Sequence, residues 1–389
     1  MIERKKNYSI RSYIWKNSTM KTLFLSLVTL AFPILSMAQS TVNGSLVHNG
    51  LTRTYSVYLP AAYDGSTPVP VVFNLHGYTS NAAQQSIYGD FKPVADTANF
   101  IVVHPNGTVQ PGTTNTQFWN VGFFPSAVDD VDFIETLLDQ LINTYNINEA
   151  RVYSTGMSNG GYMSYLLACQ SSRFAAIASV TGSMTNSTLN GCSPTKPTPV
   201  MEIHGTADAT VPYNGTTGTS PIVDVLNYWA NFNNCPATPT ITQVPNTVTT
   251  DLSTAEHWVY APGSNGVTME HFKVINGGHT WPGALLPVGV TCMDFSASKE
   301  IWRFFSQFEN PLAAINELTV QAASVLYPNP SNGNVWWTSA SDQSIQITDL
   351  QGRAFETKAE NGKLSLGFLP NGTYLLRSGN TVERLVIEQ

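Results

Sequence analysis

Short apolar runs that end at glycine alternate along the chain with amphipathic segments. Residues 69–77 and 100–107 are two such runs, a pattern typical of buried strands in a parallel sheet. Residues 127–145 instead carry apolar side chains at three- and four-residue spacing, which indicates an amphipathic helix. The strand pattern recurs at residues 53–60, 150–156, 174–182, 199–205 and 269–279, and the helix pattern recurs after Gly160 and at residues 296–308. This alternation predicts an α/β fold with a mostly parallel central sheet and helices on both faces.

The pattern changes after residue 308. Residues 309–317 have the composition of a linker, and residues 318–389 contain short strands and polar turns without a helical period. Such a segment is typical of a small all-β, sandwich-like domain. It contains no His and no Cys, so we place the chemistry in the larger domain, residues 39–308.

The first 38 residues have the pattern of a signal peptide. A basic region precedes an apolar run from Leu23 to Leu35, and small residues stand at Ser36 and Ala38. We predict cleavage after Ala38, with Met20 as a possible true start. A membrane anchor is the alternative, but the apolar run is shorter than a comfortable span.

The net charge of the chain limits the kinds of molecule that it is expected to bind. Only 12% of the residues are charged. Removal of residues 1–38 takes away six basic residues and one acidic residue, which leaves 13 basic and 25 acidic residues and a formal charge of −12. This balance argues against nucleic acid or an anionic membrane as a partner. We expect a monomer without a stable membrane span.

The mature chain has four cysteines, Cys169, Cys192, Cys235 and Cys292. An even number in an exported chain suggests two disulfides, for which three pairings are possible. We favour Cys169–Cys192, which closes a local loop, together with Cys235–Cys292. No CxxC or HxxxH spacing occurs, so we expect neither a metal centre nor a cofactor.

Residues Gly156–Gly160 form a G-x-S-x-G pentapeptide around Ser158. Glycine-serine turns are common, but this one follows a predicted strand and precedes a predicted helix. That context is the one in which α/β-hydrolases place their nucleophile, on a sharp turn with glycines on either side. We therefore predict that Ser158 is a nucleophile.

A serine nucleophile needs a base and an acid that orients the base. In this fold the chain order is serine, acid, histidine, which leaves His204, His257, His271 and His279. We choose His279 because it follows a strand and two glycines and begins a loop. We choose Asp208 as the acid because it also follows a strand and a glycine; its rivals are Asp224, in a predicted helix, and Asp251, in a polar loop.

The remaining site predictions concern the groups around the nucleophile. An oxyanion hole needs two N–H donors, and the backbone N–H groups of Asn159 and Tyr78 are the natural candidates. We expect the side chain of His76 to be structural. The aromatic residues Tyr78, Trp119 and Trp281 are expected to line the substrate groove, although core positions would explain them equally well.

Five separated motifs together resemble a known group of enzymes. They are "LHGYTSN", "FWNVG…VDDVDFI", "RVYSTGMSNGGYMSYLLAC", "IHGTADATVPYNG" and "GGHTWPG". They resemble the secreted esterases of the poly(3-hydroxybutyrate) depolymerase and feruloyl esterase group, which includes carbohydrate esterase family one. The resemblance covers residues 45–308 and implies an α/β-hydrolase fold. It carries the nucleophile role onto Ser158, the acid onto Asp208 and the base onto His279, whereas Tyr78 and the surroundings of Cys235 depart from the pattern of many relatives.

The C-terminal segment resembles a second family. "LYPNPSNG", "ITDLQGR" and "LPNGTYLLR…RLVIEQ" are similar to the type A sorting domain of the Bacteroidetes type nine secretion system. The resemblance covers residues 318–389 and implies passage through the outer membrane by the secretion machinery, followed by release or surface attachment. A carbohydrate-binding β-sandwich is the alternative, and Trp336 and Trp337 are its only support.

These observations predict a secreted serine esterase that cleaves feruloyl or acetyl esters of plant polysaccharides through an acyl-enzyme. An extracellular poly(3-hydroxybutyrate) depolymerase is the first alternative. A non-catalytic, surface-displayed binding protein on a hydrolase scaffold is an alternative of another class, and the intact Ser/Asp/His set argues against it. A peptidase of the prolyl oligopeptidase type is less expected, since no propeller-sized segment precedes the catalytic region.

Overall fold

A computed structural model describes residues 39–313, 326–338, 344–378 and 381–388. The predicted signal peptide, residues 1–38, and residues 314–317 of the predicted linker lie outside the described residues. Among the helices of the described part, none combines the length and the apolar character needed to cross a membrane.

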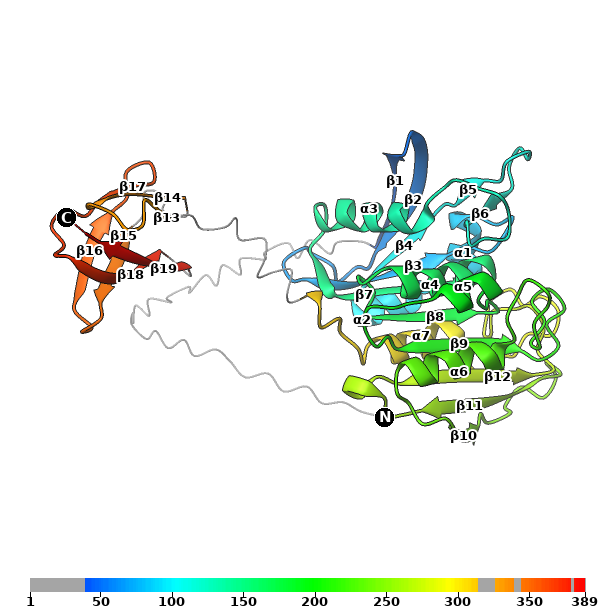
Figure 1. Ribbon diagram of the computed structural model, residues 1–389. Helices are drawn as coiled ribbons and strands as arrows, with labels where there is room; N and C mark the ends of the chain where they lie inside the picture. The colour runs from blue at the N-terminus through cyan, green and yellow to red at the C-terminus, as the bar shows by residue number, and fades with distance from the viewer. Residues whose placement is uncertain (1–38, 314–325, 339–343, 379–380, 389) are drawn as a thin grey trace, which may run out of the picture. The chain divides into compact units, whose positions relative to one another are not determined.

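The larger domain is built on one ten-stranded sheet with the strand order β1-β2-β4-β3-β7-β8-β9-β12-β11-β10 (Figure 1). The strands are β1 (Ser40–His48), β2 (Leu51–Leu59), β3 (Val69–Leu75), β4 (Ile101–Pro105), β7 (Ile147–Met157), β8 (Ala176–Val180), β9 (Val200–Gly205), β10 (Thr240–Gln243), β11 (Thr254–Tyr260) and β12 (Met269–Ile275). Neighbours from β4 to β12 pair in parallel, and the strands at both edges pair antiparallel. Parallel pairing brings the carboxyl ends of the central strands to one edge, where ligands of open α/β sheets bind.

Helices cover both faces of this sheet, because its strands are apolar on both sides. The helices are α1 (Ala82–Tyr88), α2 (Lys92–Ala98), α3 (Asp130–Ile142), α4 (Asn159–Gln170), α5 (Asn186–Gly191), α6 (Ile222–Phe232) and α7 (Ala297–Phe305). Along β3, Val71 and Phe73 pack in one core with α3, α4 and α6, whereas Val72 packs in a second core with α2 and α7. The two cores confirm the predicted arrangement of a sheet between two layers of helices.

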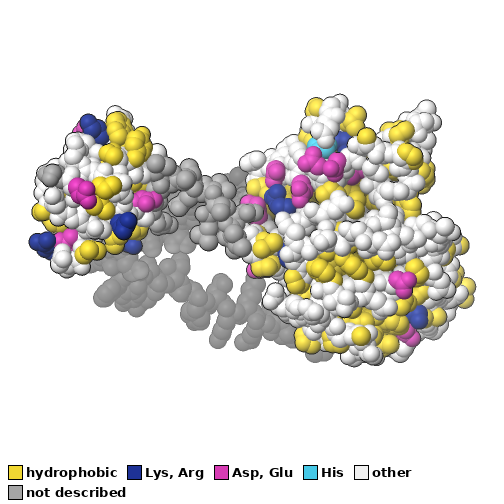
Figure 2. All heavy atoms as spheres, in the orientation of Figure 1, with side chains coloured by type: hydrophobic (Ala, Val, Ile, Leu, Met, Phe, Trp, Pro, Cys, Tyr) yellow, Lys and Arg dark blue, Asp and Glu magenta, His cyan; other side chains and the backbone are white. Residues whose placement is uncertain are grey.

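The helix predicted at residues 127–145 is shorter at both ends. It begins at Asp130, because Asp129 caps it: the Oδ1 of Asp129 accepts a hydrogen bond from the N–H of Asp132. The remaining short strands of this domain, β5 (Thr108–Val109) and β6 (Gln117–Phe118), form a separate ribbon. On this domain Figure 2 shows few charged side chains among many polar and apolar ones, as the composition leads one to expect.

The C-terminal domain has only strands in its described residues. Its two antiparallel sheets are β13 (Leu326–Tyr327), β14 (Asn334–Trp337) and β17 (Lys363–Ser365), and β16 (Ala354–Lys358), β15 (Ser344–Asp349), β18 (Gly372–Ser378) and β19 (Thr381–Ile387). They enclose a core of their own that includes Val335, Trp337 and Ile347. The all-β prediction is confirmed. Trp337 is a core residue, so of the two tryptophans only Trp336 is exposed.

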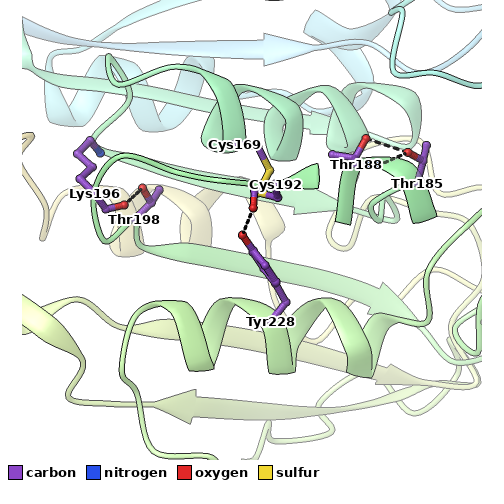
Figure 3. Close-up of a disulfide and its surroundings, with 7 residues drawn as sticks. All are labelled: Cys169, Thr185, Thr188, Cys192, Lys196, Thr198 and Tyr228. Atoms are coloured by element: carbon purple, nitrogen blue, oxygen red, sulfur yellow. Dashed lines mark hydrogen bonds between the residues drawn. A yellow bond between two sulfur atoms is a disulfide. The ribbon is translucent and has the colours of Figure 1, made fainter. Parts of the chain in front are cut away.

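One disulfide joins Cys169, at the end of α4, to Cys192, just after α5 (Figure 3). The hydroxyl of Tyr228 on α6 donates a hydrogen bond of 2.8 Å to the carbonyl oxygen of Cys192, so the bridge also contacts a third helix. The predicted Cys235–Cys292 disulfide is wrong, since both are free thiols. Cys235 packs against the core that contains α6 and Cys292 belongs to the core that contains α7, so the sheet separates them.

Removal of the Cys169–Cys192 bridge is expected to destabilise the protein. The bond spans 23 residues, and a loop of that length restricts the unfolded chain by about 3 kcal/mol. The double variant Cys169→Ser/Cys192→Ser should therefore unfold at a clearly lower urea concentration in circular dichroism. Cys235→Ser, which removes a free thiol, is the control and should change little. An unchanged urea midpoint in the double variant would contradict the assigned contribution.

Candidate active site

Ser158 lies on a strained turn between β7 and α4. Its backbone angles are φ 54° and ψ −119°, a region that residues with side chains rarely adopt. The flanking glycines allow the turn, because a Cβ on Gly160 would overlap the carbonyl oxygen of Leu75, and one on Gly156 would lie 2.6 Å from the same oxygen. The neighbouring strand β8 holds the turn through a 2.8 Å hydrogen bond from the N–H of Ser158 to the carbonyl of Val180.

Asp208 and His279 meet at the carboxyl edge of the sheet. Each follows its strand by a few residues, Asp208 after β9 and His279 after β12, and these strands are parallel neighbours. The Nδ1 of His279 lies 2.7 Å from the Oδ2 of Asp208. A carboxylate can only accept, so Nδ1 is the donor in this contact, and Nε2 is the ring nitrogen that does not contact Asp208.

The second carboxylate oxygen of Asp208 is held by the backbone. Its Oδ1 accepts hydrogen bonds of 2.8 Å from the N–H groups of both Thr210 and Val211. Burial works to raise the pKa of Asp208, but the hydrogen bond and charge of His279 and the N–H of Val211 outweigh it and lower that pKa. Asp208 is therefore an oriented, buried carboxylate at neutral pH.

The rival acids and histidines lie elsewhere. Asp224 is exposed in the first turn of α6, and Asp251 accepts hydrogen bonds from the N–H groups of Ser253 and Met293. His257 contacts Glu270 at 2.7 Å. His204 and His271 are buried side chains of β9 and β12. Of the predicted residues, the structure thus brings Asp208 and His279 together.

The backbone after β3 approaches the serine. A Cβ on Gly77 would lie 3.4 Å from the Cβ of Ser158, so the turn at Gly77 and Tyr78 runs beside this serine. Asn159 is the first residue of α4, where N–H groups have no acceptor within the helix and the positive end of the helix dipole lies. The residues of both predicted oxyanion donors therefore lie close to Ser158: Tyr78 follows Gly77, and Asn159 follows the serine itself.

A buried histidine holds the turn at Gly77. The Nδ1 of His76 donates to the carbonyl of Gly77 (2.7 Å), and its Nε2 accepts from the N–H of Gly107 (2.9 Å). The indole N–H of Trp119 donates to the carbonyl of His76. Burial lowers the pKa of His76 to about 4, so the ring is neutral, as its accepting nitrogen requires.

The aromatic residues expected in a groove have different roles. Trp119 and Trp281 are 0% and 1% exposed, so the prediction that they line the substrate groove is wrong. The side-chain amide of Asn159 holds the backbone of Trp119: its Oδ1 accepts from the N–H of Trp119 (2.7 Å), and its Nδ2 donates to the carbonyl oxygen of Trp119 (3.1 Å). Trp281 donates to the hydroxyl of Ser298 in the core. Tyr78 is exposed and stacks on Phe124, with 5.5 Å between ring centroids.

Sequence reasoning missed the side chains of Asn159 and Phe123. The amide of Asn159 gave no signal in the sequence, because its partner is the backbone of Trp119, 40 residues away. Phe123 is exposed, and its ring meets that of Tyr162 edge-on at 4.9 Å. Tyr162 lies one turn beyond the serine, since its N–H bonds to the carbonyl of Ser158.

One group of possible metal ligands occurs in the described residues. Asp251, Cys292 and Asp294 place donor atoms within 4.8 Å of one another. The carboxylates are already engaged, since Asp251 accepts from the N–H of Met293 and Asp294 accepts from the N–H of Thr247. These acids orient loop backbone, so we assign no metal to the group.

The neutral state of His76 predicts a pH dependence of stability. A histidine whose pKa is about 4 when folded and 6.5 when unfolded binds its proton first in the unfolded chain. Stability therefore falls as the pH drops from 6.5 towards 4, by about 1.4 kcal/mol per pH unit for each such histidine. His76→Gln should lower the slope of unfolding free energy against pH by that amount in urea titrations between pH 6 and 4.5.

His104→Gln is the matched control for this measurement. His104 is also buried, and burial lowers its pKa to about 3, so its loss should lower the slope equally without touching the turn at Gly77. If the slope of His76→Gln equals that of the wild type, His76 is not a neutral buried group.

Two family models match parts of the chain. Residues 92–191, which contain the turn at Ser158, match the prolyl oligopeptidase family, and residues 325–388 match the secretion system C-terminal sorting domain. The first match, together with the sheet order, confirms the predicted α/β-hydrolase fold. The second confirms the predicted sorting domain and indicates a protein that is secreted or attached to the outer cell surface after type nine secretion.

The chain is also similar to curated esterases. It is 26% identical over 297 residues to the bifunctional acetylxylan esterase/xylanase XynS20E of Neocallimastix patriciarum, a match over 75% of this chain and 39% of that protein. It is 28% identical over 287 residues to feruloyl esterase C of Emericella nidulans, over 70% of this chain and 88% of that protein. The chain thus spans well under two thirds of the first relative and most of the second.

A solved structure, the acetyl xylan esterase from Aspergillus awamori, is a more distant likeness. It is 16% identical, with a TM-score of 0.48, and the match covers 68% of this chain and 99% of that chain.

Proposed function

We propose that the protein is a serine esterase that hydrolyses carboxylic esters of plant polysaccharides, with Ser158, His279 and Asp208 as its catalytic triad. The observation that carries the proposal is the 2.7 Å contact between His279 and a buried, backbone-held Asp208 at the sheet edge where Ser158 occupies a strained turn. The names of the related esterases support the reaction class.

The first half of the reaction forms an acyl-enzyme. The hydroxyl oxygen of Ser158 attacks the ester carbonyl while Nε2 of His279 takes its proton, and the N–H groups of Tyr78 and Asn159 hold the oxyanion. His279 then gives the proton to the leaving alcohol oxygen, which breaks the ester bond. Asp208 stays ionised throughout, keeps the proton on Nδ1 and stabilises the imidazolium.

Water completes the cycle. His279 takes a proton from a water molecule, whose oxygen attacks the acyl carbonyl, and the collapse of the second tetrahedral intermediate returns the proton to Ser158 and releases the carboxylic acid. The turn held by His76 and Trp119 keeps the N–H of Tyr78 in place for both steps, so the oxyanion hole is preorganised.

Exposed apolar side chains near these residues support an uncharged substrate. Tyr78, which follows Gly77 next to the serine, is exposed, and so is Phe123, whose ring contacts Tyr162 one turn after the serine. Leu285, 81% exposed, belongs to the loop after His279. That loop returns to the site, because the N–H of Gly278 donates to the carbonyl of Val290. Aromatic faces and apolar contacts suit a feruloyl group and sugar rings, and feruloyl or acetyl esters are therefore our first choice.

A polyester such as poly(3-hydroxybutyrate) is the second candidate. Leu285, Leu286 and Val288 are all well exposed in one loop, and such a patch would suit adsorption to an apolar polymer surface. The similar proteins XynS20E and feruloyl esterase C are named for acetylxylan and feruloyl esters, which favours the polysaccharide esters.

We also propose how the chain is divided. Residues 39–308 form the esterase domain, residues 309–317 the linker and residues 318–389 the sorting domain, with residues 1–38 removed as a signal peptide. The separate cores of the two described domains and the sorting-domain match support this division.

Loss of the Ser158 hydroxyl is expected to abolish ester hydrolysis. Ser158→Ala should lower kcat/KM for p-nitrophenyl acetate by at least about 10⁴-fold, because nothing else supplies the nucleophile. Ser66→Ala is the control, since Ser66 is exposed in the loop before β3, at the amino end of that strand.

A panel of methyl ferulate, acetylated xylan and a polyhydroxybutyrate film then ranks the substrates.

The results of these assays distinguish the proposed substrates from each other and from a non-catalytic role. Turnover of the first two substrates by the wild type, and not of the film, supports polysaccharide esters; turnover of the film alone selects the polyester. Activity retained by Ser158→Ala would refute the proposed nucleophile. A wild type inactive on every ester would instead favour a binding protein on a hydrolase scaffold.

A further inference from the structure

A pair of buried, ionisable side chains lies under the candidate acid. Glu202 and His204 stand two residues apart on β9, so they share one face of the strand, and both are 0% exposed. The Nδ1 of His204 lies 2.9 Å from Oε1 of Glu202. The other oxygen of Glu202 accepts a 2.8 Å hydrogen bond from the hydroxyl of Tyr165, which belongs to α4.

The second ring nitrogen of His204 faces the loop that carries Asp208. Its Nε2 lies 2.8 Å from the carbonyl oxygen of Val211 and 3.5 Å from Oδ2 of Asp208. Val211 also donates its N–H to Asp208, so His204 contacts the residue that orients the acid as well as the acid itself. Both ring nitrogens thus face oxygen acceptors, the arrangement that suits an imidazolium with two N–H groups.

The proton of this pair can lie on His204 or on Glu202. Burial raises the pKa of Glu202, which favours a neutral pair. Burial also works to lower the pKa of His204, but the hydrogen bond and charge of Glu202, with smaller contributions from Val211 and Asp208, raise it overall. A second carboxylate, Asp208, lies on the other side of the ring, and this placement favours the ionised pair.

His271 is a neighbouring histidine with the opposite character. It is equally buried on β12, and its Nδ1 donates to the backbone carbonyl of Glu202 (2.9 Å), while its Nε2 accepts from the hydroxyl of Tyr213 (2.9 Å). Burial lowers the pKa of His271 to about 3. One nitrogen accepts and one donates, so His271 is neutral.

We propose that Glu202 and His204 are positioning residues for the triad: Glu202 holds His204 as an imidazolium, and His204 fixes the loop of Asp208 and keeps that carboxylate ionised towards His279. Through Tyr165 the pair also joins the acid loop to the helix that follows Ser158. This inference rests on the proposed esterase function for its catalytic meaning, whereas the charge of His204 is independent of it.

The charge of His204 has a consequence for the pH profile. The ionisable groups around its ring are Glu202, Asp208, His271, Tyr213 and, through Asp208, His279. Lys273 stands opposite His204 on β12, and its Nζ lies over the ring of Tyr213 at 5.9 Å. A cation beside Asp208 opposes protonation of His279, because it offsets part of the negative charge that attracts that proton. Loss of the cation makes His279 easier to protonate, so the acidic limb of the kcat/KM profile moves to higher pH.

Nitrogen NMR of the histidine side chains tests the charge directly. The full chain is labelled with ¹⁵N-histidine, and His204→Gln identifies the signals of His204 by their loss; Glu202→Gln serves if that variant does not fold, because it changes the same signals. We expect both nitrogens of His204 to be protonated at pH 8. An unprotonated nitrogen at that pH would mean that His204 is not an imidazolium and would overturn the proposal.

Kinetics test the positioning role. His204→Gln should lower kcat/KM for p-nitrophenyl acetate by about 10- to 100-fold and move the acidic limb up by about one pH unit. His271→Gln is the matched control, since it also removes a fully buried histidine, and it should leave the limb in place. A loss of rate with the same limb in both variants would mean that His204 is only structural. If the wild type hydrolyses no ester, the proposed function fails, and the NMR result still decides the charge of the pair.

Discussion

The hydrogen bond between Nδ1 of His279 and Oδ2 of Asp208 is the contact that gives this fold a site. It joins two loops that are more than seventy residues apart in the chain, and it forms because β9 and β12 are parallel neighbours whose carboxyl ends meet at one edge. The N–H groups of Thr210 and Val211 orient the other oxygen of the carboxylate. Without that support the acid would turn towards water, and the imidazole would lose its orientation.

The turn at Ser158 combines a strained backbone with rigid surroundings. Ser158 has a positive φ that costs free energy, and the close approach of Gly156 and Gly160 to Leu75 explains why this turn needs glycine. Buried polar groups hold the backbone around it. The ring of His76 donates a hydrogen bond to the carbonyl of Gly77, and the side-chain amide of Asn159 accepts one from the N–H of Trp119. These contacts fix the backbone beside Ser158, as the proposed oxyanion hole requires.

Much of the fold was predictable because burial on both faces of a central strand leaves a continuous apolar run in the sequence, as at β3 and β4. The edge strands β1 and β10 have exposed, mixed patterns and were not predicted. The contact between Asp208 and His279 was predictable, because residues that follow neighbouring parallel strands meet at one edge of the sheet. The errors have a common cause, since Trp119, Trp281, Cys235 and Cys292 all lie outside helices and strands, where periodicity does not tell how a side chain packs. Trp119 and Trp281 are buried, and Cys235 and Cys292 contact different cores.

The central claim is that Ser158 is a nucleophile activated by His279. Labelling of the full chain with a fluorophosphonate, followed by tandem mass spectrometry of the peptides, tests it most directly, because this reagent reacts with activated serines and does not depend on the choice of ester. The account predicts a single phosphonylated residue, Ser158, and loss of the label in His279→Ala. A label on another serine, or equal labelling of Ser158 in His279→Ala, would contradict it.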